Sequence, residues 1–202
     1  SRSINKKEHS IYELILDNYL DVLALSEIWC TSQTDVSIGL ITPPGYKSFV
    51  APRLTRGGGV AHICRKELDP KQIKSDKKFT CFEHITVALQ LPRETVYVTS
   101  IYYNTGVYSG TFGTEFSEFL SFLQSLPGRH LICGDLNFHV NDIDNDFANK
   151  FKTLSDQYGL VQHLNFPTHV AGNTLDVVIS RENVTLNDVS TDLSVNSDHY
   201  AI

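Results

Sequence analysis

The chain has 202 residues, of which 41% are hydrophobic and 10% aromatic, and its formal net charge is −6 at pH 7. This length fits one domain with a sizeable core, and the acidic balance excludes wholesale adhesion to nucleic acid through a basic surface. No apolar run approaches a membrane span and no basic-then-apolar leader opens the chain, so the sequence predicts a soluble, intracellular protein without a membrane partner.

The first predicted helix begins near Asn5, which can cap it while Glu8 reaches back from the third position. Its apolar face is expected to comprise Ile11, Leu14, Ile15 and Tyr19. An apolar strand over 21–26 follows and ends at Glu27. Residues 31–45 contain turn chemistry, with two prolines and a glycine at the end, and are expected to form an irregular loop.

The middle of the chain is predicted to consist of strands over 46–50, 59–64, 83–91 and 95–103, followed by an amphipathic helix from Phe112 to Leu123. A buried strand over 130–133, a polar loop and a helix over 147–158 come next, and strands over 174–180, 184–189 and 199–202 complete the pattern. Consecutive strands with few, widely spaced helices favour an α+β domain in which two sheets pack face to face with helices outside.

Cysteines and chain ends give two further expectations. The four cysteines, Cys30, Cys64, Cys81 and Cys133, lie far apart, so they are expected to be reduced core thiols and not a disulfide framework or a zinc site. The chain has no methionine and stops three residues after His199, inside a predicted strand. We therefore expect residues 1–202 to be one domain of a longer polypeptide, truncated at both ends.

Acidic residues recur where apolar strands end. Asp135 and Asn137 follow the strand over 130–133 at a spacing that puts both on one side of an extended backbone, and Glu27 follows the strand over 21–26. Asp176 lies within an apolar run, where an unpaired charge is costly. A hydrated divalent metal beside a phosphate compensates such charges, although an Asx turn at Asp135 and a solvated loop carboxylate at Glu27 explain each position singly.

A histidine completes this set. Asp176 needs a cationic partner, and His199 is the obvious candidate, since a carboxylate behind an imidazole fixes its tautomer and raises its basicity. His199 follows Asp198, so one strand entry can supply a carboxylate and an imidazole. A structural aspartate bonded to a loop backbone and a surface histidine are the alternatives. Tyr102 ends an alternating strand, where its phenol can donate to a phosphate or simply pack.

The order of these motifs resembles the endonuclease/exonuclease/phosphatase superfamily. Ser-Glu-Ile-Trp (26–29), Ser-Ile-Tyr-Tyr-Asn (100–104), Gly-Asp-Leu-Asn-Phe-His (134–139), Asn-Phe-Pro-Thr-His (165–169), Gly-Asn-Thr-Leu-Asp (172–176) and Ser-Asp-His (197–199) carry the resemblance. Within that superfamily the chain looks like the apurinic-type endonuclease domain of non-LTR (LINE-type) retrotransposons.

The resemblance implies a four-layered α/β sandwich of two packed mixed β-sheets flanked by helices. It implies an Mg²⁺- or Mn²⁺-dependent endonuclease that nicks double-stranded DNA and leaves a 3′-hydroxyl to prime reverse transcription. A reverse transcriptase continuing the same polypeptide, and residence in the nucleus with passage through the cytoplasm, are further expectations. The alternatives are a catalytically degenerate or co-opted DNA-binding fragment, and an inositol-phosphate or sphingomyelin-type phosphodiesterase.

The resemblance also assigns roles residue by residue. Glu27 and Asp198 are expected to hold the metal, and Asp135 and Asn137 to position the attacking water and the phosphate. Tyr102 would bond the phosphate, and His199, oriented by Asp176, would contact it or assist proton transfer. Arg56, Asn104 and Thr168 are expected to bind the substrate, Thr168 at the start of a hairpin that relatives put into the minor groove. The family's metal-side asparagine would precede Ser1, and Tyr103 departs from the usual pattern.

Overall fold

The computed structural model describes residues 4–32, 34–53, 57–103, 110–192 and 197–202. The helices are α1 (Glu8–Asp17), α2 (Val36–Leu40), α3 (Phe112–Ser125) and α4 (Asp146–Gln157), and a 3₁₀ turn covers Lys66–Leu68. The strands are β1 (Val22–Ser26), β2 (Tyr46–Ala51), β3 (Val60–Arg65), β4 (Lys71–Ile73), β5 (Phe82–Gln90), β6 (Thr95–Tyr103), β7 (Arg129–Asp135), β8 (Leu160–Gln162) and β9 (Asp176–Arg181).

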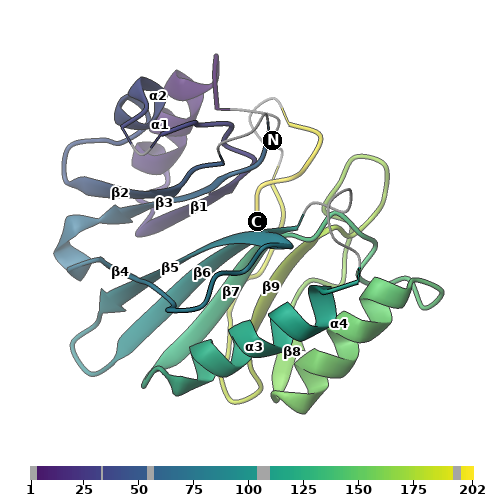
Figure 1. The fold of residues 1–202 in the computed structure, drawn as a ribbon. Helices are drawn as coiled ribbons and strands as arrows, with labels where there is room; N and C mark the ends of the chain where they lie inside the picture. The colour runs from purple at the N-terminus through teal and green to yellow at the C-terminus, as the bar shows by residue number, and fades with distance from the viewer. Residues whose placement is uncertain (1–3, 33, 54–56, 104–109, 193–196) are drawn as a thin grey trace.

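Two sheets face each other, and helices cover their outer sides (Figure 1). The small sheet has the order β1-β3-β2 and is antiparallel. The large sheet has the order β4-β5-β6-β7-β9-β8, with β6 and β7 parallel and its other pairs antiparallel. The predicted four-layered α+β sandwich is therefore confirmed, although only the large sheet mixes parallel and antiparallel pairs.

Each of the three interlayer spaces has its own hydrophobic core. Ile11 and Ile15 of α1 pack with the small sheet, and Phe112 and Phe116 of α3 pack with the outer side of the large sheet. Between the sheets lies a third cluster, which includes Phe49, Val60, Ile85, Val87, Val98 and Tyr102. Since burial of a large apolar side chain stabilises a fold by about 1.5–3 kcal/mol, these layers fix the two sheets against each other.

The N-terminal helix differs from its prediction. It begins at Glu8 with Lys7 at the N-cap position, and Asn5 does not cap it. Instead Ser37 Oγ donates to Asn5 Oδ1 (3.0 Å) and Glu8 Oε1 (3.3 Å), so both side chains connect α1 to α2. Tyr19 lies beyond the helix with φ of 51° and is 80% exposed, so it does not extend the apolar face.

Two predicted strands are also wrong or incomplete. Residues 184–189 form no strand, because Asp188 adopts φ of 55° and interrupts the extended backbone. Residues 199–202 contribute only isolated bridges, His169 to His199 and Asp192 to Ala201. The predicted loop over 31–45 contains the short helix α2, whose N-cap Asp35 accepts a hydrogen bond from Ser37 N (3.0 Å).

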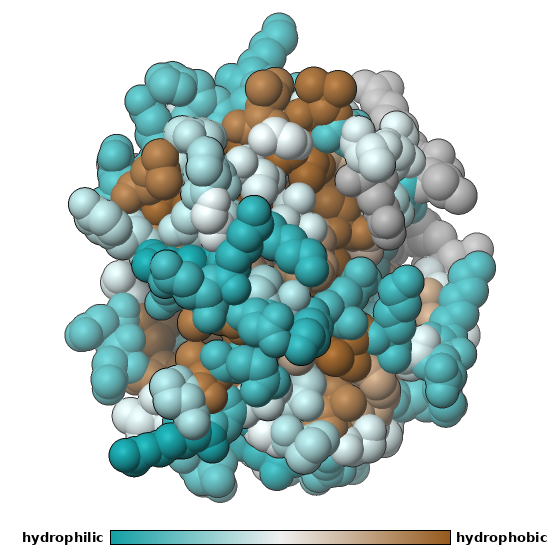
Figure 2. Space-filling model, turned by 90° about the vertical axis from the view of Figure 1, so that its left-hand side faces the viewer, coloured by the Kyte–Doolittle hydropathy of each residue, from teal (hydrophilic) through white to brown (hydrophobic). Residues whose placement is uncertain are grey.

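The surface carries both charge signs. Figure 2 shows hydrophilic side chains in a band across the middle of the face at the left of Figure 1, with hydrophobic residues above and below. In the lysine-rich stretch 65–78, Arg65 pairs with Asp21 (3.1 Å) and Lys77 with Glu118 (3.2 Å).

None of the helices in the described part of the chain has the length and hydrophobicity that a membrane span requires.

Candidate active site

Three neighbouring strands of the large sheet place polar side chains in one row. The parallel pairing of β6 and β7 sets Tyr102 beside Asp135, and the antiparallel pairing of β7 and β9 sets Asp135 beside Asp176. All three residues are buried, at 5%, 3% and 8% exposure. Since residues at the same register point to the same face of a sheet, this row forms the floor of the candidate site.

Gly134 makes this row possible. A Cβ at Gly134 would lie 1.9 Å from the carbonyl oxygen of Ile101, inside van der Waals contact, and the residue has φ of 142°. Gly134 lies within β7, where the absence of a Cβ allows β6 to approach closely.

Glu27 reaches the row from the small sheet. It follows β1 with φ of 55°, and its carboxylate accepts a hydrogen bond from the Tyr102 hydroxyl. Burial raises the pKa of Tyr102, and the hydrogen bond to Glu27 and its negative charge raise it further, while the Asn137 side chain acts in the opposite direction. The phenol is therefore neutral and remains a proton donor at physiological pH.

Asp135 and Asn137 form a tight local unit. Asn137 N donates to Asp135 Oδ1 (2.8 Å), and Asn137 Nδ2 donates to the Tyr103 carbonyl (2.8 Å). Asn137 has φ of 51°, a left-handed conformation that asparagine tolerates better than most residues. Burial raises the pKa of the Asp135 carboxyl, and the charge of Asp176 adds to this, against the opposing effect of His199.

His199 bridges two of the carboxylates. Its Nδ1 lies 2.9 Å from Asp176 Oδ2, and its Nε2 lies 3.8 Å from Asp135 Oδ2. Burial alone would lower the pKa of His199, but the hydrogen bond to Asp176 and the charges of Asp176 and Asp135 outweigh it, so the pKa is raised. The predicted contact between Asp176 and His199 is thus present, and their catalytic roles remain predictions.

The buried side chain of Thr168 forms hydrogen bonds with the backbone at the start of β9. It is fully buried, and its Oγ1 accepts hydrogen bonds from Leu175 N (3.0 Å) and Asp176 N (3.1 Å). The backbone then reverses, with Thr168 N and His169 N both donating to the Asn173 carbonyl. This arrangement holds Asp176 in place, and substrate binding by Thr168 stays a prediction.

Asp198 lies beside a histidine that the sequence analysis had not included in the site. Its Oδ2 is 3.7 Å from His169 Nε2, and the His169 ring packs edge-on against His199. His169 Nδ1 accepts a hydrogen bond from Ala171 N (3.1 Å), so the proton of the neutral ring is on Nε2, facing Asp198. The signal in the sequence was the position of His169 within the Asn-Phe-Pro-Thr-His motif.

The other predicted substrate residues, Arg56 and Asn104, lie outside the described part of the chain.

A second residue that sequence reasoning missed is Glu83, which stands opposite Tyr102 in the β5–β6 pair. Glu83 is the second residue of β5, a largely buried strand, and a carboxylate in such a strand is the kind of signal that had drawn attention to Asp176. The described site therefore draws on both sheets and on the segment that follows residue 196.

The donor set suits a hard divalent cation. Asp135, Asp176 and His199 offer ligand atoms within 4.8 Å of one another, and His169, Asp198 and His199 form a second such group. Glu27 also acts on Asp135, because its negative charge raises the pKa of that carboxyl. Clustered carboxylate oxygens are the ligands that Mg²⁺ and Mn²⁺ prefer. The predicted ligands Glu27 and Asp198 do not fall into one such group among the described residues.

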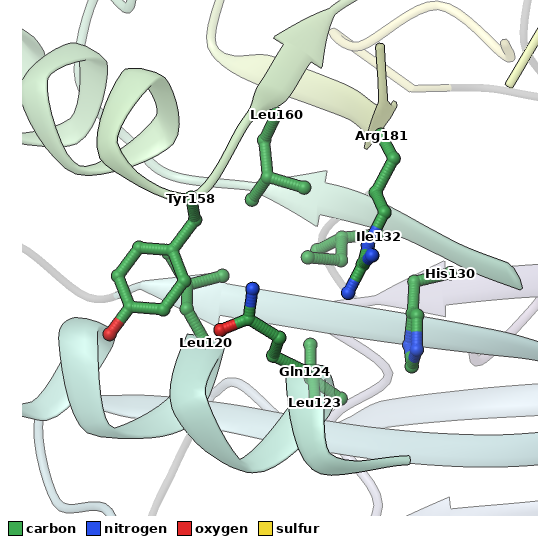
Figure 3. A pocket seen from close by; sticks show the side chains of 8 residues that line it. All are labelled: Leu120, Leu123, Gln124, His130, Ile132, Tyr158, Leu160 and Arg181. Carbon is green, nitrogen blue, oxygen red and sulfur yellow. The ribbon is translucent and has the colours of Figure 1, made fainter. Parts of the chain in front are cut away.

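A pocket on the outer side of the large sheet is separate from this site (Figure 3). It lies between α3, the C-terminal end of α4 and the strands β7, β8 and β9, and its lining residues are Leu120, Leu123, Gln124, His130, Ile132, Tyr158, Leu160 and Arg181. Its volume of about 20 Å³ has room for about one water molecule. The pocket is too small for a substrate.

Solved structures with the same fold include several nucleic-acid enzymes. The 3′ phosphatase NExo from Neisseria bound to product DNA hairpin superposes with a TM-score of 0.74 at 19% identity, covering 98% of this chain and 93% of that chain. The endonuclease domain of TRAS1, a telomere-specific non-LTR retrotransposon, gives 0.73 at 14%, covering 98% and 91%. An AP endonuclease from Archaeoglobus fulgidus gives 0.67 at 16%, covering 98% and 93%.

At these identities the likeness shows the fold alone. No curated protein sequence matches the chain. The model of the endonuclease/exonuclease/phosphatase family matches residues 2–199, which is nearly the whole sequence. The site geometry, the fold and this match agree, and the chain belongs to the endonuclease/exonuclease/phosphatase family.

Proposed function

We propose that the protein is a divalent-metal-dependent phosphodiesterase that nicks one strand of duplex DNA and leaves a 3′-hydroxyl. The observation that carries this proposal is the convergence of Glu27, Tyr102, Asp135, Asp176 and His199 from distant segments on one buried row. A structural role for each residue alone does not explain why the buried Asp135 and Asp176 meet the carboxylate of Glu27 in one place, at a cost to stability.

In the proposed reaction, water gives up a proton and adds to the phosphorus, and the P–O3′ bond breaks. The departing O3′ takes up a proton from solvent, and the products are a 3′-hydroxyl and a 5′-phosphate. Asp135 and Asn137 orient the water, and the Asp135 carboxylate is placed to accept its proton. Tyr102, neutral because of its raised pKa, donates to a phosphate oxygen. The His199 imidazole, held by Asp176, would face the phosphate, and its raised pKa favours the protonated form that stabilises negative charge there.

Glu27 and Asp135 would hold the divalent cation, and Asp198 would serve as a further acidic ligand or support. When bound, such a cation acts as a Lewis acid on a phosphate oxygen and offsets the charge of the carboxylates. Mg²⁺ and Mn²⁺ both suit oxygen ligands, and we propose Mg²⁺ as the ion used.

The finer part of the proposal is a role in retrotransposition. The motifs that resemble LINE-type endonucleases, and the likeness in fold to the TRAS1 endonuclease domain, support a nick that primes reverse transcription. The partners would then be double-stranded DNA and a reverse transcriptase continuing the same polypeptide, and the reaction would take place in the nucleus. A reverse transcriptase encoded in the sequence that flanks this gene would support this role. Flanking sequence that encodes no reverse transcriptase would contradict it.

A nicking assay tests the activity. We expect the protein to relax supercoiled plasmid in Mg²⁺ and not in EDTA. The Asp135→Asn and His199→Ala substitutions should abolish nicking. Asp156→Asn and His9→Ala, at exposed positions on α4 and α1, serve as matched controls and should nick like the wild type. Extension of the nick by a DNA polymerase without prior phosphatase treatment would identify the 3′-hydroxyl.

The same assay separates the alternatives. Salt-sensitive DNA binding without nicking by the wild type would indicate a degenerate binding fragment. Release of phosphate from inositol polyphosphates, or of the headgroup from sphingomyelin, at rates above DNA cleavage would indicate a different phosphodiesterase. Either result would overturn the proposed endonuclease.

A further inference from the structure

The turn that contains Glu27 forms backbone hydrogen bonds with a glycine segment, Gly58–Gly59, which precedes β3. Ile28 N donates to the Gly59 carbonyl (3.3 Å), and Trp29 N donates to the Gly58 carbonyl (2.9 Å). Glu27 and Trp29 both adopt left-handed conformations, with φ of 55° and 57°. Such conformations cost non-glycine residues of the order of 1 kcal/mol each, so the surrounding contacts must hold the turn in place.

Glu83 fixes the other side of the same segment. One oxygen of its carboxylate accepts a hydrogen bond from Gly59 N, and the other lies 3.3 Å from Arg53 Nε. The side chains of Arg53 and Glu83 are only 22% and 23% exposed, so this pair is better shielded than a surface ion pair. Glu83 also stands opposite Tyr102, the residue whose hydroxyl bonds Glu27.

The fit around the glycines is close. A Cβ at Gly58 would lie 2.6 Å from one Glu83 carboxylate oxygen and 2.8 Å from Arg53 Cδ. A Cβ at Gly57, one residue earlier, would meet only ordinary contacts at 3.8 Å with the Trp29 ring, although φ there is also positive at 82°. The segment therefore offers two glycines with the same backbone requirement and different surroundings.

We propose that Glu83 is a positioning residue for the metal site: through Gly59 it holds the left-handed turn that directs the Glu27 carboxylate toward Tyr102 and Asp135. This inference rests on the proposed function for the identity of the ligand, a divalent cation. In this role Glu83 acts through Gly59 and not by contact with the substrate or the ion. Outer groups that orient a ligand typically contribute about 10–100-fold to metal affinity or activity.

The test uses the full chain, Mn²⁺ alone as the probe, and the emission of Trp29, the single tryptophan, as a local reporter of the turn. We expect Glu83→Ala to weaken Mn²⁺ binding by about tenfold or more and to shift Trp29 emission. Glu83→Gln should retain most of the affinity, because the amide oxygen still accepts from Gly59 N. In the nicking assay Glu83→Ala should raise KM for Mg²⁺ and leave kcat at saturating Mg²⁺ nearly unchanged.

Two controls match these changes. Gly58→Ala should reproduce the Glu83→Ala losses without altering charge, whereas Gly57→Ala carries the same backbone penalty and should bind Mn²⁺ like the wild type. Glu94→Ala removes a carboxylate paired with Arg129 (2.8 Å) at the β5–β6 turn and should also leave Mn²⁺ binding unchanged.

Three results would overturn the proposal. The first is that Glu83→Ala and Gly58→Ala fold and keep the Mn²⁺ affinity and Trp29 emission of the wild type. The second is that Gly58→Ala and Gly57→Ala lose Mn²⁺ affinity to the same extent. The third is unfolding of both Glu83→Ala and Gly58→Ala, which would assign the contact to general stability. Because Mn²⁺ binding and Trp29 emission need no DNA cleavage, a wild-type protein that binds Mn²⁺ without nicking overturns the proposed function alone. If the wild type binds no Mn²⁺, the proposal for Glu83 is judged by whether Trp29 emission shifts in Glu83→Ala and Gly58→Ala but not in Gly57→Ala.

Discussion

The carboxylate of Asp176 holds the imidazole of His199, with 2.9 Å between Oδ2 and Nδ1. The proton of the neutral ring is therefore on Nδ1, and Nε2 is left facing Asp135. Asp176 is itself fixed, because its backbone N–H donates to the buried hydroxyl of Thr168. One orientation of the histidine thus depends on a chain of contacts that begins in the segment before β9.

Replacing Asp176 by asparagine tests this chain of contacts. The amide removes the negative charge that raises the pKa of His199 and leaves only a neutral acceptor for Nδ1, so the histidine should titrate at lower pH. We expect kcat for nicking to fall by about 10–100-fold, by analogy with other groups that orient a catalytic imidazole. NMR titration of the His199 ring measures the pKa directly, and an unchanged titration in a folded variant would contradict the assignment.

Without metal, the stability of the protein should fall as pH rises above neutrality. The folded-state pKa of His199 is raised above 6.5, so its stabilising contribution is complete below pH 6.5 and is lost as pH rises through the folded value. The pKa of Asp135 is also raised, from 3.8 to about 7, so the folded state keeps a proton that the unfolded chain releases, and stability falls between pH 3.8 and about pH 7 for this reason too. Urea unfolding in EDTA at pH 6 and pH 8 measures the difference.

The Asp135→Asn variant removes the contribution of Asp135 and also reduces that of His199, because the charge of Asp135 helps to raise the pKa of His199. Removing a buried charge should stabilise the metal-free protein at pH 8 by about 1–3 kcal/mol and should reduce the decline between pH 6 and pH 8. Saturating Mg²⁺ should stabilise the wild type by about 2.7 kcal/mol at 100 times Kd, and the variant by less. A variant that gains as much from Mg²⁺ as the wild type would show that Asp135 takes no part in holding the ion.

The elements that the sequence predicted best are those with a continuous apolar run or a full helical face. Phe112, Phe116, Phe119, Leu120 and Leu123 are all buried along α3, as their spacing predicted. The strands β4 and β8 have three residues each, too few to show a period, and α2 has five residues in a stretch rich in turn-forming residues. Residues 184–189 have the composition of a strand, but Asp188 breaks the extended backbone.

The sequence predicted which residues belong to the candidate site. It did not predict how their side chains are arranged in space. A carboxylate inside an apolar run requires a partner, and this rule led from Asp176 to His199. The rule did not give the register that aligns Tyr102, Asp135 and Asp176, because register depends on pairing between strands that are distant in the sequence. It also missed His169, since a histidine on a turn carries no burial signal.

The hydroxyl of Tyr102 connects the two sheets at the site, so Tyr102→Phe should separate its role from that of packing. The ring stays and the donor to Glu27 is lost. We expect kcat for nicking to fall by about 10–100-fold while the urea midpoint changes little, because the phenyl ring preserves the buried apolar area. Tyr97→Phe, on the same strand and also buried, is the matched control and should cut like the wild type. Equal activity of both variants would exclude a direct role for the Tyr102 phenol.

Gly134→Ala tests whether the close approach of β6 and β7 is what builds the site. The added Cβ would meet the Ile101 carbonyl oxygen at 1.9 Å and its backbone nitrogen at 2.8 Å, and a backbone cannot move aside as a flexible side chain can. We expect a loss of about 3 kcal/mol or more in unfolding free energy, together with loss of nicking.

Gly113→Ala is the matched control for Gly134→Ala. It adds the same methyl group within α3, where nothing lies within 4 Å, and should stabilise the protein by up to about 1 kcal/mol. Urea unfolding of the two variants against the wild type gives the comparison. A Gly134→Ala protein with wild-type stability would mean that β6 and β7 tolerate a wider spacing. The register of Tyr102 with Asp135 would then not depend on this glycine.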